Sequence, residues 1–226
     1  MNPPAVTGID GCAGGWIAVT LAVGGAVTSV TVAATLDGLS LTGVAAIDMP
    51  LGLLGAGWRD ADGLARRALG RRGVTVFAIP PRPAWECATY AEANLVCRDL
   101  TGKGFSVQAW GLRRKIAEAD TCRRRAASSV PPARFCEVHP ELSFTAMAGA
   151  PVPDSKHTPA GLAIRRKLLA VAGITLPLSV AGAAEDDLLD AAAVAWSARR
   201  IAAGRAAILT NPAQRSDDGG EIAIRY

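Results

Sequence analysis

The fold is decided by residues 5–23, which read AVTGIDGCAGGWIAVTLAV. Residues 5–9 are a short apolar run that predicts a buried strand, and this run ends at Asp10-Gly11. Glycines at positions 11, 14 and 15 then predict a tight turn. Residues 16–23 place large apolar side chains at every second position, as a strand with one face in the core does. The stretch therefore predicts the first hairpin of a sheet.

The sheet continues beyond this hairpin. Residues 26–34 return as a strand after Gly24-Gly25, residues 44–47 form a buried strand that ends at Asp48, and residues 135–138 form a fifth strand. The run 74–79 meets three prolines, so it predicts an ordered loop or an edge piece. Helical patterns fill the rest of the chain, at about residues 59–69, 85–100, 107–127, 161–172 and 185–203.

This order predicts an α/β fold with a five-stranded mixed sheet, in which a three-strand meander is followed by parallel crossovers. The same order matches the RNase H-like fold. We expect a single domain over residues 1–226, with a basic helical insertion at about residues 59–134 between the fourth and fifth strands.

Composition excludes several classes of protein. Half of the residues are apolar and 19% are charged, which predicts a packed core and excludes a disordered chain. The five cysteines are odd in number and include no C-x-x-C pair, so we expect reduced thiols rather than a disulfide scaffold or a zinc ribbon. Residues 11–36 carry no charge, but glycine, threonine and serine dilute them too much for a membrane span. With no basic signal-peptide flank, we expect a cytoplasmic protein without a membrane partner.

The net charge of +4 is unevenly distributed. Residues 59–134 hold fifteen Lys and Arg against seven Asp and Glu, while the remainder holds nine against thirteen. A GC-rich genome explains an excess of arginine without any function. The alternative is a basic, phosphate-attracting surface beside an acidic centre.

Carboxylates stand where such a centre would form. Asp10 and Asp48 each follow a predicted strand, and Asp187 and Asp190 lie three residues apart on the last helix, so both project to one side of it. Glu137 is a further candidate at the end of the fifth strand. Turn formation and helix capping account for single residues of this kind. Crowded together, carboxylates repel unless they are protonated or bridged by cations, and their hard oxygen atoms suit Mg²⁺ or Mn²⁺. We therefore expect two such ions.

The chain resembles the DUF429 family, whose members are described as predicted RNase H-like nucleases. The resemblance rests on blocks in the same order along nearly the whole chain: GIDGCAGGW at 8–16, AIDMPLGL at 46–53, 59–70, VFAIPPR at 76–82, 108–120, EVHPE at 137–141, 155–156 and DDLLDA at 186–191. Asp187 and Asp190 are also similar to the carboxylate pair in the final helix of RuvC-type Holliday junction resolvases. The resemblance implies an acidic metal centre of Asp10, Asp48, Glu137, Asp187 and Asp190. At Ala78 we expect the family usually to have proline.

The first hypothesis is therefore a metal-dependent nuclease. Asp10, Asp48, Asp187 and Asp190 would be its catalytic residues, and a homodimer is compatible with the sequence. Substrate contacts are expected from polar residues of the matching blocks: Arg59, Arg66, Arg82, Gln108, Lys115 and Lys156.

Two alternatives remain open. One is a non-catalytic protein that binds nucleic acid or a single ion. The other is an actin-like nucleotide phosphotransferase, in which Asp10-Gly11 would bind phosphate and residues 217–220 would form a second phosphate loop.

Overall fold

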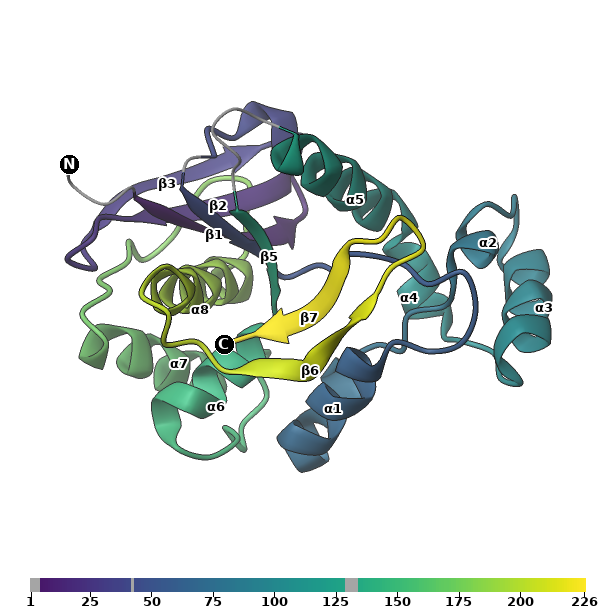
Figure 1. The fold of residues 1–226 in the computed structure, drawn as a ribbon. Coiled ribbons are helices and arrows are strands. Elements are labelled where there is room, and N and C mark those ends of the chain that lie inside the picture. The colour runs from purple at the N-terminus through teal and green to yellow at the C-terminus, as the bar shows by residue number, and fades with distance from the viewer. Residues whose placement is uncertain (1–4, 42, 129–133) are drawn as a thin grey trace.

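The computed structural model describes residues 5–41, 43–128 and 134–226. Its centre is a seven-stranded sheet in the order β3-β2-β1-β4-β5-β7-β6 (Figure 1). The strands are β1 (Val6–Cys12), β2 (Gly15–Leu21), β3 (Val27–Ala33), β4 (Val44–Ile47), β5 (Arg134–Val138), β6 (Ile208–Arg215) and β7 (Glu221–Arg225). The expectation of a mixed α/β fold is confirmed, and the expected strand number of five is wrong.

Strand direction follows the length of the connections. Strands β1, β2 and β3 are antiparallel neighbours joined by short turns. Strands β4, β5 and β7 each run parallel to their preceding neighbour in the sheet, and longer segments with helices connect them. The final β6–β7 hairpin is antiparallel.

Helices cover the two faces of the sheet and form a lobe at one side (Figure 1). Between β4 and β5 the chain forms α1 (Asp60–Leu69), α2 (Arg82–Trp85), α3 (Tyr90–Thr101), α4 (Val107–Gly111) and α5 (Arg113–Ala127). After β5 come α6 (Pro140–Ala148), α7 (Pro159–Val171) and α8 (Glu185–Ala202). Two short 3-10 helices are η1 (Leu36–Gly38) and η2 (Gly70–Thr75).

The alternation of the strands divides the core into two layers. Val6 of β1 and Ala46 of β4 pack in the layer that contains α8. Ile9 of β1 and Ile47 of β4 point to the other side of the sheet and pack in the opposite layer. Ile116 of α5 lies in that second layer. The two faces of the sheet are therefore buried by different helices, α8 on one and α5 on the other.

Helix α8 lies very close to β1 because the residues between them are small. A Cβ atom added at Gly8 would stand 2.0 Å from the backbone nitrogen of Ala195 and 2.3 Å from the carbonyl oxygen of Ala191. Both alanines are fully buried. Glycine in the strand and alanine in the helix allow the backbones to meet, which brings the start of α8 over the end of β1.

The α2–α4 lobe has a small core of its own. Trp85 stacks on Trp110 with ring centroids 6.2 Å apart, and Tyr90 meets Phe105 edge to face at 5.6 Å. Helix α3 begins with a capping box in which Thr89 and Glu92 bond each other's backbone. Aromatic packing thus stabilises this lobe, and Trp85 also packs against the core layer of the sheet that contains Ile116.

Several elements differ from the sequence expectations. The helix expected over 85–100 is divided into α2 and α3, and the helix expected over 107–127 is interrupted at Leu112. Helix α6 was not expected, although Pro140 at its first turn is a common helix start. Strands β6 and β7 were not expected. Pro212 interrupts the strand pattern of β6, whose pairing with β7 shifts register between Leu209 and Gln214. Of the run 74–79, expected as an ordered loop or an edge piece, residues 74–75 end η2 and residues 76–79 form a loop.

All five cysteines are free thiols. Among the helices described, none combines the length and the apolar character needed to cross a bilayer.

The close contact between β1 and α8 predicts a large cost for Gly8→Ala. Because the new methyl group would overlap backbone atoms that cannot rotate away, we expect the free energy of unfolding to fall by roughly 2–4 kcal/mol. Thermal unfolding of the purified variant measures this. Gly24→Ala is the matched control, since a Cβ there meets nothing within 4 Å. An equal melting temperature for Gly8→Ala and wild type would contradict the packing described.

Candidate metal centre

Three carboxylates from distant parts of the chain meet at one end of the sheet. Asp10 lies in β1, Asp48 directly follows β4, and Asp190 lies in the second turn of α8. One oxygen atom from each lies within 4.8 Å of the others. It is the one group of this kind in the described part of the chain. Three oxygen ligands at this separation can surround a divalent cation.

Strand geometry brings the first two residues together. The N–H of Asp48 donates to the carbonyl oxygen of Ile9 at 2.9 Å, which extends the parallel β1–β4 ladder by one residue and sets Asp48 beside Asp10. Side chains alternate between the two faces along each strand, and both aspartates fall at positions on the face that packs on α8. Their side chains therefore face the helix that carries Asp190.

Burial raises the pKa of all three carboxyl groups. The pKa of Asp10 lies well above its usual range because burial disfavours its charge and because Asp48 and Asp190 add like charge. Burial likewise raises the pKa of Asp48 to about 7 and that of Asp190 to about 6, against the lowering effect of Lys156. A buried acidic cluster of this kind costs folding free energy unless positive charge compensates it.

One lysine supplies positive charge within the cluster. The Nζ atom of Lys156 lies 2.6 Å from Oδ2 of Asp190 and 3.7 Å from Oδ2 of Asp186. The other oxygen of Asp190, Oδ1, is buried and has no hydrogen-bond partner among the residues that the structure describes. Buried carboxylate oxygens are normally satisfied, so this atom points to a missing cationic or donor partner.

Two of the five expected metal ligands lie outside the cluster. Cys136 and Val138 pack in the layer of α8, so strand alternation directs Glu137 to the opposite face. There Glu137 accepts hydrogen bonds from Arg59 at 2.6 Å and from the N–H of Leu51 at 2.7 Å. Its charge is thus balanced within the protein.

Asp187 stands one turn before Asp190 and also lies outside the cluster. Its Oδ2 accepts a hydrogen bond from the N–H of Ala184 at 3.2 Å, which is a capping interaction at the start of α8. Asp187 lines the pocket but does not share the ligand positions of Asp10, Asp48 and Asp190.

The cluster lies in a pocket of about 530 Å³. Other pocket walls include Met49 and Pro50 after β4, Phe77 before α2, and His139 and Glu141 at the start of α6. The Nδ1 atom of His139 accepts a hydrogen bond from the N–H of Glu141 at 3.3 Å, and burial lowers its pKa. His139 is therefore a neutral helix-capping group.

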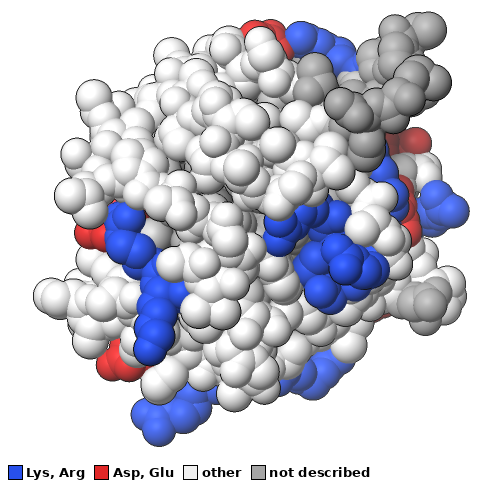
Figure 2. All heavy atoms as spheres, turned by 90° about the vertical axis from the view of Figure 1, so that its left-hand side faces the viewer, with Lys and Arg blue, Asp and Glu red and all other residues white. Residues whose placement is uncertain are grey.

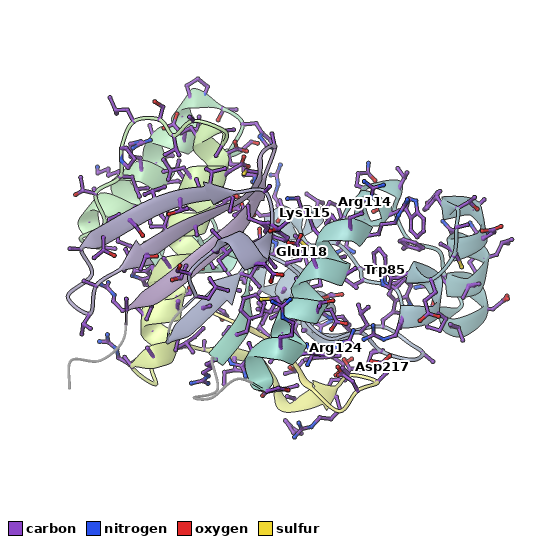
Figure 3. All side chains as sticks on the ribbon, turned by 90° about the horizontal axis from the view of Figure 1, so that it is seen from above. Trp85, Arg114, Lys115, Glu118, Arg124 and Asp217 are labelled. Carbon is purple, nitrogen blue, oxygen red and sulfur yellow. The ribbon has the colours of Figure 1, made fainter. Side chains whose placement is uncertain are left out.

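Only two of the six expected substrate contacts line this pocket, and these are Lys115 and Lys156. The Nζ atom of Lys115 donates to the carbonyl oxygens of Gly15 and Cys12 and lies 4.3 Å from the centre of the Trp16 ring. Figure 3 shows Lys115 and Glu118 on the side of α5 that faces the strands. Lys115 thus joins α5 to the glycine-rich turn of the first hairpin.

The other four expected substrate contacts lie elsewhere. Arg59 is 2% exposed and is held by Glu137 and Asp62, so a substrate cannot reach it. Arg82 pairs with Asp120 and Asp217. Arg66 on α1 and Gln108 on α4 are exposed.

Much of the basic excess of residues 59–134 is neutralised by acids from the rest of the chain. Four partners are Asp37, Glu137, Asp217 and Asp218, which pair with Arg125, Arg59, Arg82 and Arg123. Figure 2 shows the side of the molecule away from the α2–α4 lobe, and there Lys and Arg side chains of the described residues stand in separate groups among uncharged atoms. The ion pairs of these four arginines offset part of the positive charge of residues 59–134.

The residues proposed as a second phosphate loop, 217–220, form the turn of the β6–β7 hairpin. The N–H of Ser216 donates to the carbonyl oxygen of Gly220 at 2.8 Å, and Arg82 and Arg123 occupy the carboxylates of Asp217 and Asp218 (Figure 3 shows Asp217 near one end of α5). This turn joins the last hairpin to the helical insertion and is not placed at the acidic cluster.

Sequence reasoning missed the environment of Lys156. Asp186 looks like an ordinary helix-start carboxylate, yet it lies 3.4 Å from Nδ1 of His157 and near Lys156. In the sequence, Lys156 and His157 stand in a polar loop and Asp186 stands in an acidic helix start. These basic and acidic residues become neighbours only because α7 packs against α8.

Comparison with known proteins gives a family match. The family model described as "Protein of unknown function (DUF429)" matches residues 8–215. No curated protein and no solved structure matches the chain.

The raised pKa of Asp48 predicts that Asp48→Asn stabilises the metal-free protein at alkaline pH. The folded chain retains a proton on Asp48 up to about pH 7, whereas the unfolded chain releases it near pH 4. Stability should therefore fall as the pH rises through this window. In EDTA at pH 8, we expect the variant to unfold at least roughly 2–4 °C above wild type. At pH 4 this advantage should be lost.

Thermal unfolding of both proteins across pH 4–8 measures this difference. Asp99→Asn is the matched control because Asp99 is an exposed carboxylate on α3. A variant that is less stable than wild type at pH 8 would show that the buried charge is already compensated.

Proposed function

We propose that this chain, which belongs to the DUF429 family, is a divalent-metal-dependent nuclease whose centre is Asp10, Asp48 and Asp190. The observation that carries the proposal is the convergence of three carboxylates, one of which presents a buried oxygen without a hydrogen-bond partner among the described residues. Repulsion and burial of these carboxylates lower the free energy of unfolding, and a bound cation would offset this destabilisation.

The donor set favours a hard cation. The three candidate ligands are carboxylates, and neither cysteine sulfur nor imidazole nitrogen belongs to the group. Mg²⁺ and Mn²⁺ prefer such oxygen ligands, and Mg²⁺ in particular is commonly held by a few carboxylates together with substrate phosphate. Zinc sites, in contrast, are usually built from thiolates and imidazoles.

The open pocket beside the ligands supports hydrolysis of a phosphate ester. When bound, the metal would lower the pKa of water and balance charge on the phosphoryl oxygens. In the reaction, the water oxygen forms a bond to phosphorus and the bond from phosphorus to the leaving sugar oxygen breaks. The leaving oxygen takes up a proton, so one water is added across the ester.

A polyanionic substrate fits the surroundings of the pocket. Lys115 and Lys156 line it, and Arg113 and Arg114, which precede Lys115 on α5, are exposed. Arg66 and Gln108 are exposed on the insertion and stay proposed substrate contacts. Positive side chains near an acidic metal centre favour phosphate approach and would make binding depend on salt.

The strand order supports an RNase H-like assignment of the fold. The order β3-β2-β1-β4-β5, with an antiparallel meander and then two parallel strands, is the one expected for that fold. Helix α8 returns across β1 and supplies an acidic residue there. Within this assignment, β6 and β7 would be an addition at one edge.

The proposal predicts cleavage of DNA or RNA that requires Mg²⁺ or Mn²⁺. A panel of single-stranded, duplex and branched substrates, analysed by gel electrophoresis, measures it. Because Asp10 and Asp190 would be direct ligands, Asp10→Asn and Asp190→Asn should lower the rate by about 100-fold or more. Asp99→Asn should retain the wild-type rate.

Two results would contradict the proposal. Equal cleavage by wild type and Asp10→Asn would mean that another site or a contaminant is responsible. Binding of metal and nucleic acid without cleavage of any substrate would instead favour the non-catalytic alternative.

A further inference from the structure

We infer that the centre holds one divalent ion and that the ammonium group of Lys156 takes the place of a second. This inference rests on the proposed metal centre and changes the expected number of ions from two to one. Its basis is the position of Lys156 Nζ, 2.6 Å from Asp190 Oδ2, inside a cluster that otherwise contains only carboxylates.

The two oxygens of Asp190 have different roles in this arrangement. Oδ2 accepts the hydrogen bond from Lys156, whereas Oδ1 is buried and has no partner among the described residues. A carboxylate that bridges two cations would offer one oxygen to each. Here one cation is the lysine of the chain itself, and Oδ1 stays available for a metal ion.

Charge favours the same count. Three ionised carboxylates and one ammonium group leave a charge of −2, which a single divalent ion balances. Two divalent ions beside Lys156 would leave the buried centre at +2, and further carboxylates would be needed. Among the described residues, other carboxylates line the pocket, but none shares the ligand positions of the cluster. Arg59 holds Glu137, the N–H of Ala184 holds Asp187, and Asp186 lies beside Lys156 and His157.

The backbone around Lys156 is fixed rather than free to swing. Buried Arg165 donates to the carbonyl oxygen of Asp154 at 3.0 Å, and Thr158 donates through Oγ1 to that of Ser155 at 2.9 Å. A Cβ at Gly161 would stand 1.9 Å from the Ser155 oxygen, so α7 packs tightly on this loop. These contacts fix the backbone beside Lys156, and the ion pair with Asp190 then places its ammonium group at the cluster.

Lys156 is therefore a positioning residue with a fixed positive charge. Its ammonium group orients Asp190 and reduces repulsion between the carboxylates and an arriving phosphate. It cannot lower the pKa of a bound water as a metal ion does, so activation of water depends on the single ion alone.

The test counts Mn²⁺ bound per full-length chain by isothermal titration calorimetry and by electron paramagnetic resonance of free Mn²⁺. Wild type should bind one ion in the cluster. Lys156→Met and Lys156→Gln should each bind two, because removal of the ammonium group exposes Asp190 Oδ2 to a second ion. Lys156→Arg keeps the charge and should bind one. Lys115→Met is the matched control, since Lys115 lines the same pocket but contacts carbonyl oxygens, and it should also bind one.

Two ions on wild type, or one ion on both neutral Lys156 variants, would overturn the inference. Circular dichroism verifies that each variant is folded, and the partial exposure of Lys156 makes either neutral variant tolerable. No Mn²⁺ on wild type would overturn the metal centre together with this inference. One ion on wild type and two on the neutral variants, without cleavage of nucleic acid, would support this inference while the nuclease proposal fails.

Discussion

The site depends on repulsion between three carboxylates that lie close together in a largely buried space. One oxygen atom from each of Asp10, Asp48 and Asp190 lies within 4.8 Å of the others, and among the described residues the ammonium group of Lys156 is the cation that pairs with this cluster. Burial raises the pKa of each carboxyl group, so the metal-free site is a cost to folding. A cation removes that cost, and this is the physical reason for treating the cluster as a metal centre rather than as a polar patch.

The fold produces this convergence through two periodicities. The two-residue period of β1 and β4 directs Asp10 and Asp48 to the face covered by α8 and directs Glu137 of β5 away from it. Small residues between β1 and α8 allow the helix to approach until Asp190 lies over the strand ends. The same helix uses Asp187 for its own first turn, since that residue is near the unsatisfied backbone N–H groups.

Sequence patterns predicted the first five strands, the last helix and the aspartates at 10, 48 and 190 because each depends on local periodicity. They did not separate these aspartates from Glu137 and Asp187, because the distinction depends on the face of β5 and on a capping bond. They also gave Arg59 and Arg82 as substrate contacts. Their acidic partners Glu137 and Asp217 lie more than seventy residues away and become neighbours only in the folded chain. The β6–β7 hairpin was missed for a similar reason, since its pairing with β5 is short and its first strand contains Pro212.

Anomalous X-ray diffraction from crystals grown with Mn²⁺ tests the central claim most directly, because it locates the ions without reference to activity. We expect one strong anomalous peak bounded by Asp10, Asp48 and Oδ1 of Asp190, with the ammonium group of Lys156 retained on Oδ2. Absence of a peak at these residues, or a peak in the position of the Lys156 ammonium group, would contradict it.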